Sequence, residues 1–151
     1  MPDELLRPTI GAPVDLSVRP WRLMSQTYVA FFGGVIAVTT IAFLNARRLG
    51  VDAAKRRLIL LTGAVGLIAS LFVLFTIDFR TDDPYEAVQN AATTAIASVT
   101  SYVQQRIQRA MDRAVQLRGI DYRPLWGPGI AASVGGIAVL MLLVYLGDMV
   151  L

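Results

Sequence analysis

Two long apolar runs, joined by a short basic segment, constrain this chain more than any other feature. The runs cover 24–44 and 58–77, and the basic loop 45–57 lies between them. A helix needs roughly 20 apolar residues to cross the hydrocarbon core of a bilayer. Charged residues make up 17% of the sequence, against roughly a quarter in soluble domains. These features predict a transmembrane hairpin over 23–78.

A third apolar run covers 126–151 and begins with Trp126, Gly127 and Pro128. Trp21 lies just before the first run, and Trp126 is the first residue of the third. Amphipathic aromatic rings favour the headgroup layer of a membrane. The proline-rich segment 1–22 has no sustained period and is predicted to be an extended tail. We therefore expect an all-α integral membrane protein with three transmembrane helices and one long amphipathic helix between the second and third.

The long amphipathic helix is predicted within the extramembrane segment 79–125, over about 84–118. Asp83 is the expected N-cap, Pro84 the first helical residue, and Gly119 the stop. Apolar residues recur in steps of three and four between these limits, which places them in one stripe along the helix. If the stripe packs against a partner helix or a second copy, the polar residues between the apolar ones would form its solvated back, and they are Gln89, Asn90, Thr93, Thr94, Gln104, Gln105 and Gln108.

Three roles are open for this helix. Its Ala- and Val-rich stripe favours packing against a protein partner or a second copy of the chain. It also fits a helix lying on membrane lipid, with arginines reaching phosphates, or a rigid spacer folded back on the spans. The residues expected to make partner or lipid contact are Val99, Val103, Ile107, Ala110 and Ala114, with Arg106, Arg109 and Arg113 beside them.

Small residues recur at helical spacing in each apolar run, which permits close helix packing. The predicted packing residues are Ala30, Gly33, Gly34 and Ala37 in the first run, Thr62, Gly66 and Ser70 in the second, and Gly129, Ser133 and Gly136 in the third. A few polar side chains in or next to the apolar runs could line a polar path, and they are Thr39, Thr40, Asn45 and Thr62. For the threonines we favour hydrogen bonds to the carbonyl of the preceding turn over a polar path.

The basic loop predicts the orientation. It contains a single acidic residue, Asp52, against five basic ones, which are Arg47, Arg48, Lys55, Arg56 and Arg57. Basic loops stay in the cytoplasm by the positive-inside rule. With three crossings, the N-terminus is then expected outside and the C-terminus in the cytoplasm.

The residue types that enzymes most often use as nucleophiles, acid–base groups and zinc ligands are largely missing from this chain. The chain contains no Cys and no His, which excludes thiolate nucleophiles, imidazole catalysis and zinc sites with those ligands. No catalytic, cofactor or metal residue is predicted, and no nucleic-acid partner, since acids alternate with arginines outside the basic loop. We therefore expect the protein not to be an enzyme.

Two functions from different classes are compatible with the sequence. The favoured one is a non-catalytic accessory or interaction subunit, with membrane lipids and a protein partner or a second copy as its contacts. The alternative is a homo-oligomeric pore or channel, which is less favoured because the spans offer little polar lining. The residues Ser25, Gln26, Ala30, Phe32, Gly33 and Gly34 together resemble small bacterial membrane proteins, a resemblance that implies no function.

Overall fold

The chain forms four helices in the residues that the computed structural model describes, which are 19–76 and 84–150. They are α1 (Ser25–Arg48), α2 (Ala53–Thr76), α3 (Pro84–Leu117) and α4 (Trp126–Val150). Within these ranges the only β-type pairing is an isolated bridge between Trp21 and Arg123. The all-helical prediction is therefore confirmed. The segment 1–18, most of the expected tail, and the expected cap Asp83 lie outside the described residues.

By length and composition alone, three of the helices could cross a membrane, as the sequence predicted. They are α1, α2 and the part of α4 from Trp126 to Gly147. Between the second and the third lies α3, 34 residues long. It ends next to Gly119, whose φ of +67° closes the helix in the left-handed region that favours glycine.

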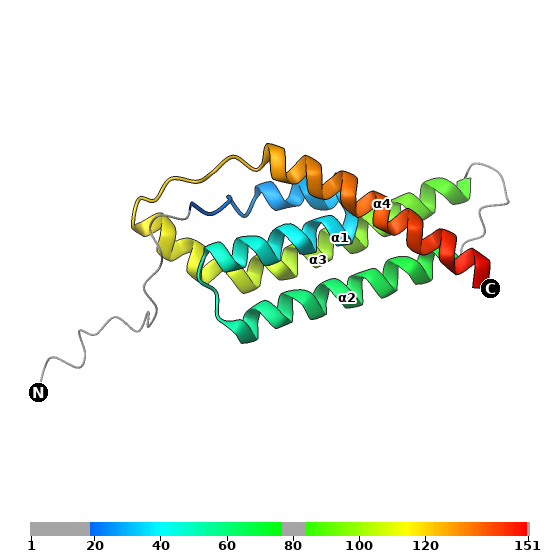
Figure 1. Cartoon of the computed structure of the whole chain (residues 1–151), viewed down its shortest axis with the longest axis horizontal. Coiled ribbons are helices and arrows are strands. Elements are labelled where there is room, and N and C mark those ends of the chain that lie inside the picture. Colours follow the sequence, from blue (N-terminus) through cyan, green and yellow to red (C-terminus); the bar gives the residue numbers. More distant parts are fainter. Residues whose placement is uncertain (1–18, 77–83, 151) are drawn as a thin grey trace, which may run out of the picture.

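The first helix is not one continuous rod. Gly34 has φ 70° and ψ −166° in the middle of α1, a backbone conformation that essentially only glycine adopts. The chain reverses there, so the arm from Ser25 to Gly33 and the arm from Val35 to Arg48 run side by side in opposite directions (Figure 1). The predicted uninterrupted helix over 24–44 is wrong at this point, because a Gly-Gly pair permits a turn where hydropathy alone indicates continuity.

Neither arm of this hairpin is long enough to cross a bilayer. At 1.5 Å per residue the two arms measure roughly 14 Å and 21 Å, against about 30 Å of hydrocarbon. The reversal brings both ends of α1 together, and the backbone N–H of Trp21 donates a hydrogen bond of 2.7 Å to Asn45 Oδ1. α1 is therefore a helical hairpin that begins and ends at the same end of the bundle.

The other helices surround this hairpin (Figure 1). α3 lies antiparallel to α2, as shown by the hydrogen bonds from Gln104 to the Ile59 carbonyl and from Gln89 to the Leu74 carbonyl. It also packs along both arms of α1, and α4 packs on α1 from the other side. The long helix is therefore an integral part of the bundle.

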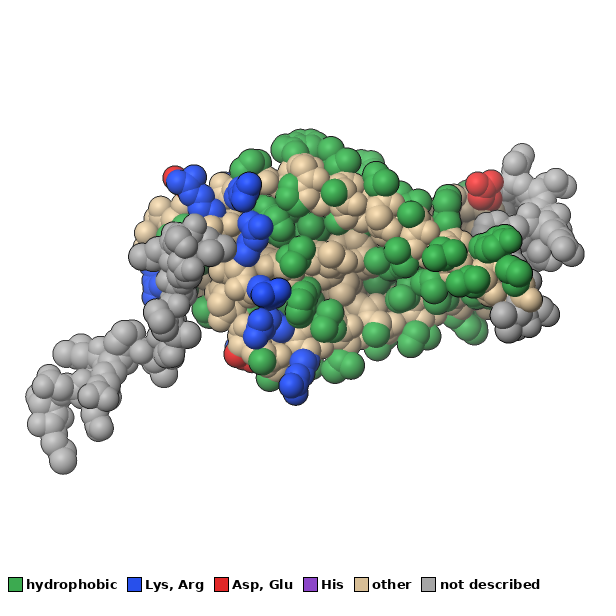
Figure 2. Space-filling model, in the orientation of Figure 1, with side chains coloured by type: hydrophobic (Ala, Val, Ile, Leu, Met, Phe, Trp, Pro, Cys, Tyr) green, Lys and Arg blue, Asp and Glu red, His purple; other side chains and the backbone are tan. Residues whose placement is uncertain are grey.

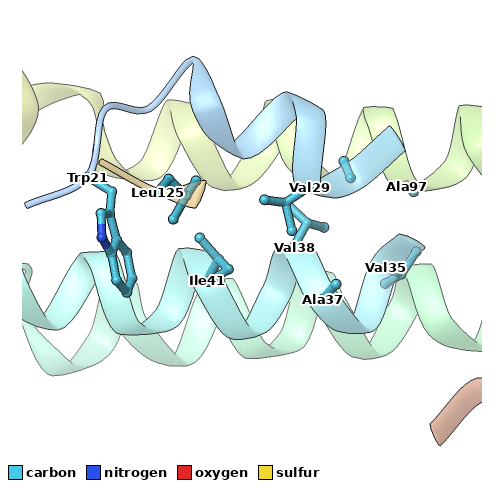
Figure 3. Close-up of a cluster of buried hydrophobic side chains, with 9 residues drawn as sticks. Trp21, Val29, Val35, Ala37, Val38, Ile41, Ala97 and Leu125 are labelled. Carbon is cyan, nitrogen blue, oxygen red and sulfur yellow. The ribbon is translucent and has the colours of Figure 1, made fainter. Parts of the chain in front are cut away.

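Two apolar clusters hold the hairpin in place. The first lies between its arms and includes Val29, Val38 and Ile41, with Ala97 from α3 and Leu125 before α4 (Figure 3). The second lies at the end of the bundle where α1 ends and α2 begins, and includes Leu49, Ile59 and Val115. All of these side chains are at most 7% exposed. Their burial supplies the hydrophobic stabilisation of the hairpin.

Basic residues gather at the end of the bundle where the hairpin begins and ends (Figure 2). Every described Lys and Arg lies before α1, at the α1–α2 joint, in the last third of α3 or in the loop before α4. At the opposite end α3 begins with the exposed Glu86. Trp126 is 81% exposed, as an interfacial ring would be, whereas Trp21 is 2% exposed under the Arg48 guanidinium, 3.9 Å from its ring.

Candidate functional site

The buried face of α3 is polar. Gln104 and Gln108 are completely buried, and Gln89, Thr100, Ser101 and Asp112 are at most 6% exposed. The expectation that the glutamines form a solvated back is wrong for Gln89, Gln104 and Gln108, because that face packs against α1 and α2. Gln105 is half-buried and donates hydrogen bonds to Thr27 and Ser101.

The spacing along α3 explains why these side chains point inward together. Thr100, Gln104, Gln108 and Asp112 follow one another at intervals of four, so they form one stripe along the helix. The neighbouring elements fit this stripe closely. A Cβ added to Gly66 of α2 would collide with the Thr100 hydroxyl, so glycine there lets the polar face of α3 approach α2.

Gln104 is the centre of the polar interior. Its Nε2 donates a hydrogen bond of 2.9 Å to Thr39 Oγ1 on the second arm of α1 and one of 3.2 Å to the Ile59 carbonyl of α2. One amide therefore joins three helices. Its Oε1 is buried and has no partner among the described residues.

Gln108 extends the polar interior toward the basic end. Its Oε1 accepts a hydrogen bond of 3.2 Å from Asn45 Nδ2, and its Nε2 donates to Gln26 Oε1 at 3.5 Å. Asn45 in turn accepts the bond from the Trp21 backbone. Gln26 and Asn45 are both completely buried, and Gln26 Nε2 has no partner among the described residues. Unsatisfied buried amides are typical sites of internal water or a bound polar group.

Asp112 closes this stripe at the basic end, beyond the uncharged part of α3 over 87–105. Its carboxylate accepts hydrogen bonds from the Tyr122 hydroxyl at 2.8 Å and from Gln116 at 3.0 Å. Burial raises the pKa of the Asp112 carboxyl, and the two hydrogen bonds oppose that rise. Burial and the bond to Asp112 also raise the pKa of Tyr122.

The tip of the α1 hairpin lies deep in the bundle among small residues. A Cβ on Gly33 would be 2.5 Å from Ala37 Cβ and 2.6 Å from Ser133 Oγ. A Cβ on Gly136 would be 3.0 Å from Ala37 and from the Gly33 carbonyl. Thus Gly33 and Ala37 lie on opposite arms of the turn and meet α4 there.

The other predicted packing residues have varied places. Ala30 is buried, and Gly129 approaches Val29, whose Cγ2 would be 3.3 Å from an added Cβ. Thr62 and Thr40 donate hydrogen bonds to the carbonyls of Ile59 and Ile36, as expected for threonines in helices. Thr39 and Asn45 instead belong to the polar interior. Ser70 is 4% exposed, and its hydroxyl has no partner among the described residues.

The residues predicted to contact a partner or lipid lie on the outer face of α3 or at its edges. Val99 is 64% exposed and Val103 is 38% exposed. Ala110, Arg106, Arg109 and Arg113 are exposed, whereas Ile107 and Ala114 are half-buried. Of the predicted topology residues, Arg47, Lys55 and Arg57 are exposed and Arg48 and Arg56 are partly covered.

Some of this interior was missed by the sequence analysis. Gln26 lies at the beginning of an apolar run, and a buried amide in such a run is a signal that it packs on another polar group. In the described part of the chain no group of three or more Asp or Glu residues could hold a metal ion. Comparison with protein-family models, curated proteins and solved structures finds no match to this chain.

Proposed function

We propose that this integral membrane protein provides a path for small uncharged polar solutes through the interior of a single chain. The observation that carries the proposal is Gln104, a completely buried amide that joins α1, α2 and α3 and whose oxygen has no partner in the described part of the chain. A polar interior of this kind removes the main argument against a pore, the lack of polar lining in the three apolar runs. No catalytic step is part of the proposal.

The arrangement of α3 supports its placement within the bilayer. Residues 87–105 carry no formal charge, and most of their polar side chains are covered by α1 and α2, with Gln89, Thr100, Ser101 and Gln104 buried. Asn90, Val99, Tyr102 and Val103 are exposed on the outer face. A helix whose polar groups bond inside the bundle can lie in lipid although its composition is polar. On this proposal α2, α3 and α4 cross the membrane, and α1 enters and leaves at one side.

This arrangement changes the orientation that we propose. The basic end faces the cytoplasm by the positive-inside rule. Because both ends of α1 lie at that end, residue 19 is cytoplasmic, and after three crossings the C-terminal end of α4 is outside. The sequence-based orientation counted 24–44 as a crossing and kept 79–125 outside the membrane, so it placed both ends of the chain on the opposite sides.

We propose an uncharged solute because the polar groups at depth in the described interior are amides and hydroxyls rather than ionisable side chains. Charge-coupled carriers usually need ionisable side chains at depth in the membrane. The described interior between Gln104 and the far end of α3 contains amides and hydroxyls but no buried acid or base. Such groups exchange hydrogen bonds with neutral polar molecules and give little compensation for the desolvation of an ion.

Solute flux through purified protein in liposomes tests the proposal. Stopped-flow light scattering would follow the entry of water, glycerol and urea after an osmotic step. We expect faster entry of at least one of them than in protein-free vesicles, and slower entry for Gln104→Leu, which keeps the size and removes the amide. Asn90→Leu on the exposed face of α3 is the matched control and should retain the flux. Entry rates equal to those of protein-free vesicles for all three solutes would refute the proposal.

An interaction subunit is the second candidate, and the exposed outer face of α3 favours it. Val99, Tyr102 and Val103 form an apolar surface beside Arg106 and Arg109. A photo-crosslinking residue at 99 would capture a partner chain or a second copy, whereas the same residue at buried 104 would not. Crosslinking to lipid alone at position 99 would count against this candidate.

A further inference from the structure

A cavity of about 170 Å³ lies just beyond the turn of the α1 hairpin. All four helices contribute to it, so it exists only because the hairpin stops halfway along the bundle. None of the described side chains that line it carries a formal charge. The lining residues that matter for its chemistry are Gly34, Val35, Ile36, Leu67 and Ser70.

Ser70 lines this cavity and carries a buried hydroxyl without a hydrogen-bond partner among the described residues. The other described hydroxyls of α2 follow the usual helical habit, with Thr62 donating to Ile59 and Thr76 to Phe72 at 2.9 Å and 2.6 Å. The Ser70 hydroxyl is buried at 4% residue exposure and has no partner in the described chain. A buried hydroxyl without a partner costs free energy, and a bound polar molecule would remove that cost.

The turn adds backbone polarity to the same space. The second arm of α1 begins next to Gly34, and Val35 and Ile36 of its first turn line the cavity. The first N–H groups of a helix have no acceptor within it and carry a partial positive charge. The cavity therefore combines hydrogen-bonding groups at the turn and at Ser70 with apolar walls such as Leu67.

We infer that this cavity is a binding site for a short polyol or a similar small uncharged amphiphile, an inference that rests on the proposed function. Its volume corresponds to roughly six water-sized units at about 30 Å³ each. Small-molecule sites commonly combine apolar walls with a few placed polar groups. An ion would leave its charge without a partner here, and a lipid tail would leave Ser70 unsatisfied.

The experiment uses glycerol as the probe and the full chain in liposomes. Because the sequence has no cysteine, Ser70→Cys places a single thiol in the cavity. We expect methyl methanethiosulfonate to modify it, and glycerol at ten times its Kd to slow that reaction about tenfold. Val65→Cys, on the 67% exposed face of α2, is the control whose reaction glycerol should not change.

A second pair of variants links the site to flux. Ser70→Phe fills the cavity and should reduce glycerol entry to the rate of protein-free vesicles, whereas Val65→Phe adds the same bulk outside and should not. Glycerol entry that Ser70→Phe leaves unchanged, or a Ser70→Cys thiol that glycerol does not protect, would overturn the inference while the flux proposal stands. Protection without any wild-type flux would support the site and refute the proposed transport.

Discussion

The backbone N–H of Trp21 and the side chain of Asn45 are joined by a hydrogen bond of 2.7 Å although 24 residues separate them in the chain. In a continuous helix those residues would be about 36 Å apart at 1.5 Å per residue. The bond therefore requires the reversal at Gly34. It also connects the entrance of the hairpin to the polar interior, because Asn45 donates to Gln108 at 3.2 Å.

Asn45→Ala should destabilise the fold by roughly 2–6 kcal/mol. The substitution leaves the Trp21 N–H and the Gln108 Oε1 without a partner in a buried place, and each such loss costs about 1–3 kcal/mol. Thermal unfolding in detergent would measure the effect. Asn90→Ala, at an exposed position, should unfold with the wild type, and equal stability of the two variants would contradict the role assigned to Asn45.

Gly34→Ala should weaken the hairpin through its backbone alone. Nothing lies within 4 Å of an added Cβ at Gly34, so the cost comes from its φ of +70°, about 1–3 kcal/mol for a non-glycine residue there. Gly127→Ala also meets nothing within 4 Å and has no positive φ. A Gly34→Ala variant as stable as Gly127→Ala would show that the chain does not reverse at this residue.

Single cysteines in this cysteine-free chain should report the sides of the membrane. Arg22, Ala54 and Arg118 are exposed at the basic end, and Glu86 is exposed at the other. In intact cells an impermeant thiol reagent should label Glu86→Cys and leave Arg22→Cys, Ala54→Cys and Arg118→Cys unlabelled until the cells are opened. Labelling of Arg22→Cys with protection of Ala54→Cys would restore the first helix as a full crossing.

Tyr122→Phe should destabilise the basic end in a pH-dependent way. The lost hydroxyl donates to the Asp112 carboxylate at 2.8 Å, and a hydrogen bond to a charged group contributes roughly 1.5–3 kcal/mol. The raised pKa of Asp112 means that its ionisation costs stability as pH rises through the folded pKa. The difference between variant and wild type should therefore be largest above that pKa and shrink below it. Melting curves recorded from about pH 4 to pH 8 would measure it, and a pH-independent difference would contradict this account.

Much of the helical architecture could be predicted from the periodicity of apolar residues and from the signals at helix ends. The sequence predicted the third span from Trp126, where α4 begins, and a helix over 84–118, where α3 runs from Pro84 to Leu117. Proline at the first turn and glycine after the end act locally, so they can be read without knowledge of the fold. Apolar length likewise indicates α2, because its lipid-facing surface requires it.

The interior of the bundle could not be predicted in the same way. Hydropathy treats Gly33 and Gly34 as part of one run, and only the packing of Ala37, Ser133 and Gly136 around the turn favours the reversal. The periodicity of α3 defines two faces but not which one is buried. The answer depends on Thr39, Asn45 and the Ile59 carbonyl, which lie far away in the sequence and satisfy its amides.

The sequence by itself determined which helices are apolar enough to cross a membrane and where the helices end, because apolar content and end signals act within one segment. The tertiary structure decided which side of each helix faces inward and that α1 reverses at Gly34. Those choices depend on hydrogen bonds and close contacts between distant segments, and in a bilayer every buried polar group must find such a partner.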